Sequence, residues 1–151
     1  MPDPFSSIRI DVSEPSGSWK TNGTTFVDIP GLTSRKLDLL QGDFVEVSLI
    51  PDSLQSESYI GISGKNGGVA GDFQLVAATD TGPALTFGSQ RVRLDHTSGW
   101  NLHLPPSSVS FALKIDAAMQ GIRFRMRAQQ NAPHGHAVVH HVKMLVKVHR
   151  S

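Results

Sequence analysis

The sequence contains no cysteine, so it can form neither disulfide bridges nor thiolate zinc sites, and it has no cysteine nucleophile. Long apolar runs are also missing, because no stretch approaches the roughly 18 consecutive apolar residues of a membrane span. Neither charge sign dominates, since 14 basic and 13 acidic residues give a formal net charge of +1. No global field selects a polyanion or a lipid surface. We therefore expect no nucleic-acid partner and no membrane insertion.

What the chain does contain is suited to a small folded protein. Its 151 residues and 16.3 kDa predict a single domain over residues 1–151. The charged fraction of 18% is too low for a disordered polyelectrolyte. Residues 1–7 lack the basic and apolar regions of a signal peptide. We expect a cytoplasmic protein, or one that is exported or displayed at the cell surface by a non-classical route.

Alternation of apolar and polar residues recurs along almost the whole chain. The apolar members of these runs include Ile8, Ile10 and Val12; Val45, Val47 and Leu49; Ile60 and Ile62; Phe73, Leu75 and Ala77; Val92 and Leu94; Val109, Phe111, Leu113 and Ile115; Ile122, Phe124 and Met126; and Val142, Met144, Val146 and Val148. Fourteen glycines and nine prolines supply the turns between them. This pattern predicts eight or nine half-buried strands in an all-β antiparallel sandwich, most simply a jelly roll. Residues 32–40 fit either one helical turn or a further strand.

Histidines gather near the carboxyl end, over residues 134–141. In a strand, His134, His136 and His140 lie on one face, where imidazoles can share a transition metal as in cupin-type sites. No glutamate lies nearby to complete such a site. The alternatives are a polar loop and strand edge, or imidazoles that contact a ligand directly.

A second concentration of charge is the arginine ladder, which consists of Arg123, Arg125 and Arg127 on one side of a predicted strand. Unpaired guanidinium groups are too costly to bury, so we expect these side chains on an outer face. Ion pairs in solvent, a subunit interface and an anion site are all consistent with the ladder. Nucleic acid is disfavoured because Phe124, which alternates with the arginines, belongs to the opposite face of the strand, and Tyr59 is the only tyrosine in the sequence.

Motifs of enzymes are not found. Residues 61–65 contain glycine and serine, but without the spacing of the G-x-S-x-G nucleophile turn. We expect neither catalysis nor a cofactor. Trp19 and Trp100 lie in segments rich in serine, glycine and asparagine, where an indole either stacks on a sugar or plugs an end of the sandwich.

Two segments resemble a known family. Residues 26–32, Phe-Val-Asp-Ile-Pro-Gly-Leu, and residues 59–73, which begin Tyr-Ile-Gly-Ile-Ser-Gly-Lys-Asn-Gly, are similar to segments of small TNF-like bacterial lectin domains. One such domain is the fucose-binding N-terminal half of a two-domain Burkholderia lectin. The resemblance implies a TNF-like jelly roll that forms a homotrimer, with a sugar bound where two protomers meet.

The same resemblance implies which residues bind the sugar. Tyr59 matches a tyrosine of the family site, while Gln74 and Leu75 replace its paired threonine and tyrosine. Arg91 or Arg93 corresponds to one arginine of the family, and the second falls near His134. The binding residues that we predict are Tyr59, Gln74, Arg91, Arg93, His134 and His136.

The final predicted strand supports assembly independently, because Leu145 makes its second face partly apolar and such strands are usually covered on both sides. We therefore predict a trimeric carbohydrate-binding lectin whose partners are glycans. The alternatives are a structural or adhesive trimer without a small ligand, and a cupin-like metal-binding protein that uses residues 134–141.

Overall fold

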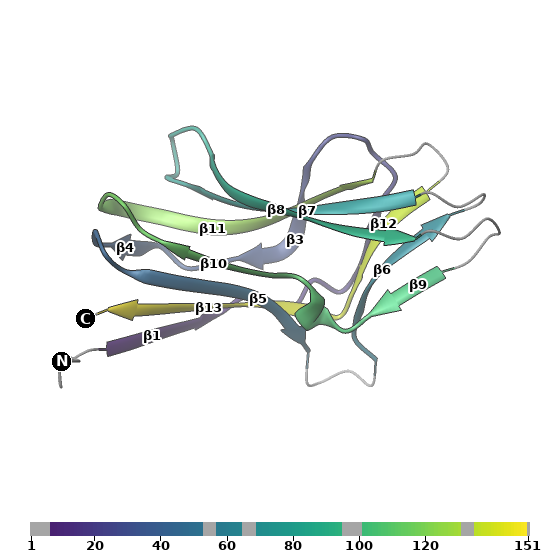
Figure 1. The fold of residues 1–151 in the computed structure, drawn as a ribbon, viewed down its shortest axis with the longest axis horizontal. Helices are drawn as coiled ribbons and strands as arrows, with labels where there is room; N and C mark the ends of the chain where they lie inside the picture. The colour runs from purple at the N-terminus through teal and green to yellow at the C-terminus, as the bar shows by residue number, and fades with distance from the viewer. Residues whose placement is uncertain (1–6, 53–56, 65–68, 95–100, 131–134, 151) are drawn as a thin grey trace.

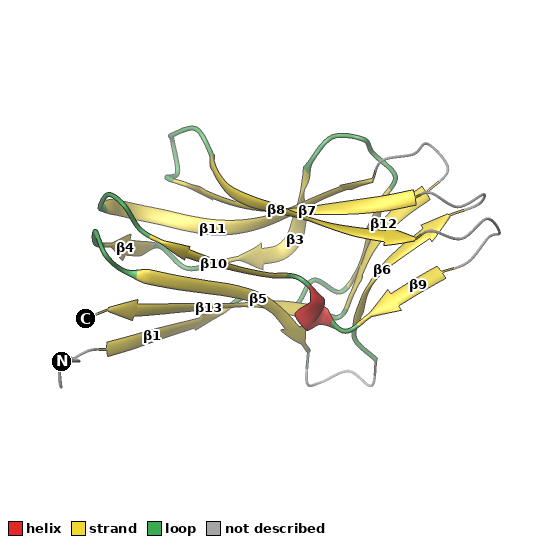
Figure 2. Ribbon diagram, in the orientation of Figure 1, coloured by secondary structure: helices red, strands yellow, loops and turns green. Residues whose placement is uncertain are grey.

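The computed structural model describes residues 7–52, 57–64, 69–94, 101–130 and 135–150. In these ranges the regular structure is antiparallel β-strand, apart from one short 3-10 helix (Figures 1 and 2). The elements are β1 (Ser7–Val12), β2 (Ser18–Thr21), β3 (Val27–Thr33), β4 (Leu37–Leu39), β5 (Phe44–Pro51), β6 (Tyr59–Gly64), β7 (Val69–Ala78), β8 (Leu85–Leu94), β9 (Asn101–Leu104), η1 (Pro106–Ser108), β10 (Ser110–Lys114), β11 (Met119–Gln130), β12 (Gly135–His140) and β13 (Val142–Arg150).

One layer of the sandwich is a sheet that bends sharply in its middle. The strands β1-β13-β5-β10 form one ladder and β2-β12-β6-β9 form another. Each strand of the second ladder continues, along the chain, a strand of the first, and the order across the two ladders is the same. We call the whole layer the bent sheet, with β1-β13-β5-β10 as its proximal half and β2-β12-β6-β9 as its distal half.

The other layer consists of β3-β11-β7-β8, with β4 paired to the beginning of β11, and we call it the arginine sheet. The chain passes between the two layers after β2, before β5, after β6, after β8, before β11 and after β11. Eight segments in two four-stranded layers with this order make a jelly roll. The predicted all-β antiparallel jelly roll is therefore confirmed, and the segment that fitted helix or strand contains the strand β4.

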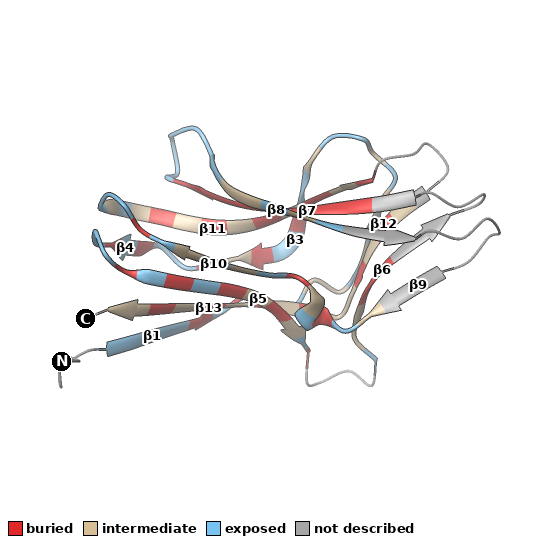
Figure 3. Cartoon of the chain, viewed as in Figure 1, coloured by how far each residue is buried: buried red, intermediate tan, exposed pale blue. Residues whose placement is uncertain are grey.

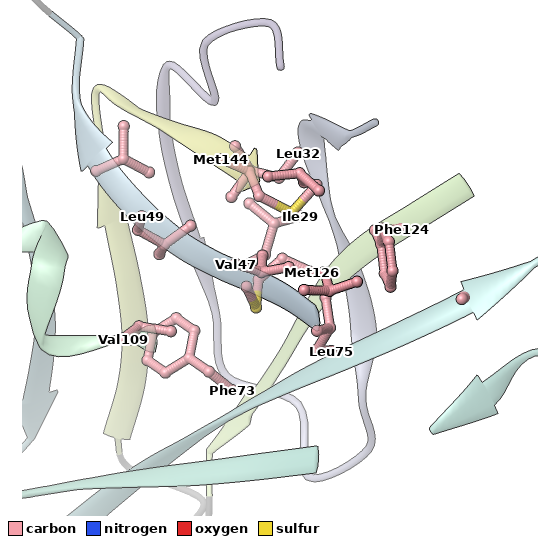
Figure 4. Close-up of a cluster of buried hydrophobic side chains, with 14 of the residues drawn as sticks. Ile29, Leu32, Val47, Leu49, Phe73, Leu75, Val109, Phe124, Met126 and Met144 are labelled. Atoms are coloured by element: carbon pink, nitrogen blue, oxygen red, sulfur yellow. The ribbon is translucent and has the colours of Figure 1, made fainter. Parts of the chain in front are cut away.

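The core lies between the layers, where inward-facing side chains of both sheets meet (Figure 4). Phe73 and Phe124 come from the arginine sheet, while Val47 and Met144 come from the bent sheet, and all four are fully buried. Burial of such a side chain stabilises the fold by about 1.5–3 kcal/mol. The predicted alternation is correct in β11 and β13, where every second side chain faces this core.

The alternation in β1 is correct, but the implied direction of its faces is wrong. Ile8, Ile10 and Val12 are exposed, whereas Asp11 is buried. The Asp11 carboxylate accepts a hydrogen bond of 3.0 Å from the backbone N–H of Arg35, and the Arg35 Nε lies 3.3 Å from it. Because these partners satisfy a buried carboxylate, the polar side of β1 can face inward and its apolar side faces out.

The end of β13 is fastened to the turn before β5. The Asp43 carboxylate is 3% exposed and accepts hydrogen bonds from Arg150 Nη2 at 2.8 Å and from the backbone N–H of Leu40 at 2.8 Å. Hydrogen bonding to Arg150 is the main reason that the pKa of Asp43 is lowered below its ordinary value of 3.8. The charged form of this side chain therefore stabilises the fold.

We expect Asp43→Asn to lower the free energy of unfolding at neutral pH by about 2 kcal/mol, since a charge-assisted hydrogen bond is lost. A lowered folded-state pKa gives stability that is complete above pH 3.8 and disappears as the pH falls through the folded-state value. The difference between wild type and variant should therefore shrink in acid, as measured by urea denaturation at neutral pH and below the folded-state pKa. The exposed Asp116→Asn is the control, and an equal loss in both variants would contradict the assignment.

Candidate functional site

Tyr59 begins β6 and lies directly opposite His140 of β12 in the distal half. Their rings stack with centroids 4.8 Å apart and an interplanar angle of 24°. The His140 ring also meets the edge of the His141 ring, with centroids 4.2 Å apart. Tyr59, His140 and His141 form what we call the ring cluster. Stacking on His140, whose own ring is braced by the edge contact with His141, holds the phenol in one orientation, as a preformed binding surface requires.

A hollow of about 360 Å³ opens beside Tyr59. Its walls come from the start of β6 and the segment between β9 and β10, and its lining residues are Glu57, Ser58, Tyr59, Leu104, Pro105 and Pro106. The Ser58 Oγ is buried and has no hydrogen-bond partner among the described residues. Buried hydroxyl groups normally have a partner, so this atom favours an ordered water, or a ligand hydroxyl that reaches it after a side-chain movement.

The ring cluster stands where the bent sheet changes direction. His141 joins β12 to β13 with a φ of 50°, and Gly17 on the neighbouring connection has a φ of 64°. The His141 N–H donates to the Gly17 carbonyl at 2.9 Å, and the His141 carbonyl accepts from the Asp52 N–H at 2.9 Å. These bonds tie three connections together across the bend. The Lys143 Nζ lies 3.9 Å from the buried Asp52 carboxylate and places a charge pair under the cluster.

The predicted sugar-binding residues are divided between the two layers. Tyr59 and His136 occupy outward positions of the distal half, whereas Gln74 and Arg91 belong to the arginine sheet. Arg93 lies in β8 opposite Ala70, but its side chain is outside the part of the chain described, as is the whole of His134. One chain therefore does not bring the described members of the predicted set together.

Arg91 has a structural partner. Its guanidinium donates to both oxygens of Asp72, from Nε at 2.7 Å and from Nη2 at 3.1 Å, and Gln129 Nε2 donates to the same carboxylate at 3.0 Å. The hydrogen bond from Arg91 is the main reason that the pKa of Asp72 is lowered, and the same bond raises the pKa of Arg91. Both groups remain charged over the physiological range.

The arginine ladder lies on the outer face of the arginine sheet, as predicted. Arg125 and Arg127 both pair with the Asp28 carboxylate, Arg125 through Nη1 at 3.8 Å and Arg127 through Nε at 2.7 Å. The Arg123 Nε lies 3.7 Å from the Asp80 carboxylate. Lys36 also contacts Asp80, at 2.5 Å, and its hydrogen bond is the main cause of the lowered pKa of that carboxyl. Each of these two carboxylates thus serves two cations.

Residues 135–140 of the histidine-rich segment form β12, which is an inner strand of the distal half and does not lie at its edge. β12 pairs with β2 on one side and with β6 on the other, and His136 and His140 share its outer face as predicted. No group of three potential metal ligands occurs among the described residues. Trp19 packs against the core from β2, which agrees with its interpretation as a plug, while Trp100 lies outside the described residues.

Outward-facing apolar residues of β1 were not recognised from the sequence as a surface feature. Ile8, Ile10 and Val12 are 61%, 60% and 46% exposed, and β1 is pale blue along most of its length in Figure 3. Val12 lies opposite Leu145 of β13. We call these four residues the apolar ridge. A shallow hollow of about 300 Å³ on the same half of the sheet is lined by residues of β5, β10 and β13, including Ser48, Ala112 and Lys147.

Residues of the Tyr59 hollow were also missed. Ser58, Pro105 and Pro106 carried no motif, because they come from segments far apart in the sequence that the pairing of β6 with β9 brings together. The only available signal was the proximity of Ser58 to Tyr59 in the sequence. Among the described residues, no helix could serve as a membrane span.

Comparison with known proteins yields structural similarity but no family. No family model and no curated protein matches the chain. An Eiger TNF from S. frugiperda is similar with a TM-score of 0.48 and 11% identity, over 95% of this chain and 92% of that one. A structure of infectious bursal disease virus, Gx strain, gives a TM-score of 0.48 and 9% identity over 97% of this chain. The chain spans 32% of that viral chain. Membership of the lectin family, which the sequence resemblance implies, stays a prediction.

Proposed function

We propose that the protein is a carbohydrate-binding lectin that acts as a homotrimer, with fucose or a related monosaccharide bound in the Tyr59 hollow. The observation that carries the proposal is the oriented phenol beside an unpartnered hydroxyl: Tyr59 stacks on His140, and the Ser58 Oγ at the same hollow has no partner among the described residues. A ring face with a few polar groups around it is the usual composition of a sugar site.

Each wall of the hollow has a role in this proposal. The Tyr59 ring packs against the apolar C–H face of the sugar, and its hydroxyl can donate or accept a hydrogen bond. The Ser58 Oγ can do the same for a neighbouring sugar hydroxyl. Glu57 is exposed at the rim, where its carboxylate accepts from sugar hydroxyl groups. Leu104 and Pro105 supply the apolar remainder of the wall.

The bent sheet supports assembly into a ring. The apolar ridge runs along one edge of the proximal half, and the hollow near Ser48 and Lys147 lies toward its other edge. A ridge of one copy that seats in the hollow of the next makes a head-to-tail contact, and such contacts close into a three-membered ring when the rotation between copies is about 120°. Because β12 leads directly into β13, Tyr59 and His140 stand at the border of this interface. A bound sugar would therefore lie near two protomers.

We expect Tyr59→Ala to raise the dissociation constant for the monosaccharide by at least about tenfold, because it removes both the ring and the hydroxyl. Tyr59→Phe keeps the stacking on His140 and should lose only part of the affinity. A glycan array selects the sugar, and calorimetric titration then measures its dissociation constant for wild type, Tyr59→Ala and Tyr59→Phe. Leu85→Ala, an exposed apolar position on β8, is the matched control and should bind as wild type.

Two outcomes count against the proposal. If the array detects no glycan while light scattering finds a trimer, the protein is a structural or adhesive assembly without a small ligand. If Tyr59→Ala is folded and binds the sugar as tightly as wild type, the site lies elsewhere in the molecule.

A further inference from the structure

The outer face of the arginine sheet carries more positive than negative charge. Its ion pairs involve five cations and three carboxylates, namely Arg91, Arg123, Arg125, Arg127 and Lys36 with Asp28, Asp72 and Asp80. Asp38 of β4 adds a fourth, exposed carboxylate, which accepts a hydrogen bond from the backbone N–H of Gly121. This excess is local, because the whole chain has a formal charge of only +1. The arrangement therefore gathers cations on one side of a nearly neutral molecule.

The three ion-paired carboxylates on this face already have cationic partners. Asp72 is held by Arg91 and Gln129, and Asp80 is shared by Lys36 and Arg123. Each of them is engaged with at least two side chains and has little capacity left for another cation.

Arg125 is the least satisfied of the cations. Its Nη1 lies 3.8 Å from Asp28, beyond hydrogen-bond distance, whereas Arg127 Nε donates to the same carboxylate at 2.7 Å. The Arg125 side chain is 31% exposed. A guanidinium carries five N–H donors in a planar fork that matches a carboxylate or sulfate group. At Arg125 this fork faces outward and makes no hydrogen bond within the described chain.

Neutral polar groups lie beside one end of the ladder, whereas Arg125 lies opposite Val76 and Arg123 opposite Ala78. Across the sheet, Arg127 lies opposite Gln74, and Gln74 lies opposite Ser89. Amide and hydroxyl groups of this kind pair with the hydroxyl groups of a saccharide. The aromatic residues of these strands, Phe73, Phe87 and Phe124, instead pack in or against the core. Stacking platforms for nucleic-acid bases are therefore absent from the described part of this face.

We propose that the outer face of the arginine sheet is a second binding surface, centred on Arg125 and Arg127, for an acidic saccharide that carries sulfate or carboxylate groups. The anionic group binds the Arg125 guanidinium, and Gln74 and Ser89 contact neighbouring sugar hydroxyls. This surface is on the opposite layer from the Tyr59 hollow, so it does not depend on that site.

The test uses the full chain and three probes: dextran sulfate, polygalacturonate and uncharged dextran. Titration in a low-salt buffer should give binding of one or both charged polymers, weaker binding at high salt and none of dextran. The polymer that binds identifies sulfate or carboxylate as the group recognised. Arg125→Gln should weaken this binding about tenfold, and Arg125→Lys should restore only part of it, because an ammonium lacks the planar fork.

Two control variants and one further polymer, polyuridylate, test whether the binding is specific to this surface and to acidic saccharides. Lys20→Gln removes one positive charge from the other layer, and Tyr59→Ala removes the first site; both should bind the charged polymer as wild type does. An equal loss in Lys20→Gln and Arg125→Gln would overturn the proposal in favour of nonspecific charge attraction. Binding of polyuridylate more tightly than of either acidic polysaccharide would overturn it in favour of nucleic acid, and failure of both charged polysaccharides to bind would overturn it outright.

Discussion

Ile10→Glu is expected to convert the assembled protein into a monomer of 16.3 kDa. Ile10 is the middle residue of the apolar ridge and is 60% exposed in the single chain. In the proposed assembly it is covered by a neighbouring copy, and a carboxylate at that position would lose its water on assembly, a cost that the cross-strand Lys147 offsets only in part. Light scattering at micromolar concentration should give three times 16.3 kDa for wild type and one chain mass for the variant.

The fold of the single chain should survive this change. Ile10 lies opposite Lys147 of β13, so a glutamate there gains a cross-strand neighbour of opposite charge. Circular dichroism should therefore match wild type. Leu85→Glu places the same charge at a position that is 55% exposed on the other layer, and it should leave the trimer intact. The proposed interface would be wrong if the wild-type protein were monomeric, or if the Ile10→Glu variant assembled as the wild type does.

Gly31→Ala is expected to lower the free energy of unfolding by about 2–4 kcal/mol, which is a large fraction of the stability of a domain this size. Gly31 has a φ of 83°, in the left-handed region where residues with a Cβ are strained. A Cβ at this position would also clash with the carbonyl oxygen of Pro15. The backbone is held on both sides of the clash: Asp28 and Thr33 flank Gly31 in the ladder with β11, and the N–H of Ser16, next to Pro15, donates to the Val142 carbonyl at 2.8 Å.

A matched control separates the two causes. Gly42 has a φ of 94°, and no heavy atom lies within 4 Å of the point that a Cβ would occupy, so Gly42→Ala measures the cost of the left-handed conformation alone. We expect that variant to lose about 1 kcal/mol. Urea denaturation of both variants and wild type gives the comparison. Equal losses would mean that the contact with Pro15 relaxes without cost.

The sequence predicted the strands better than it predicted their environment. In β11, three arginines alternate with Phe124 and Met126, and only one assignment of faces avoids burying guanidinium groups. In β1 the same alternation did not show which face is buried, since Asp11 faces inward. The inward position of Asp11 is possible because its carboxylate accepts a hydrogen bond from the backbone N–H of Arg35, which is distant in the sequence. Alternation shows that two faces differ, but buried hydrogen-bond partners decide which of them is inside.

The candidate site was predictable only at its centre. Tyr59 was identified through resemblance, but its partner His140 is set by the register of β6 on β12, and no local pattern specifies that register. The hollow requires the segment around Pro105 to lie beside Tyr59, which the pairing of β6 with β9 brings about, because Ile60 lies opposite Leu104. The separation of Arg91 from Tyr59 is a consequence of topology, because β6 and β8 belong to different layers.

The position of β13 has a consequence for how the chain folds. In the proximal half, β13 lies between β1 and β5, although β5 ends at Pro51 and β13 begins only at Val142. Neither β1 nor β5 can complete its ladder until β13 arrives, so most of the pairing is long-range and folding should be slow, in the range of milliseconds to seconds. During synthesis on the ribosome, the backbone edge of β1 therefore stays unpaired until β13 emerges, which makes capture by a chaperone advantageous for this topology.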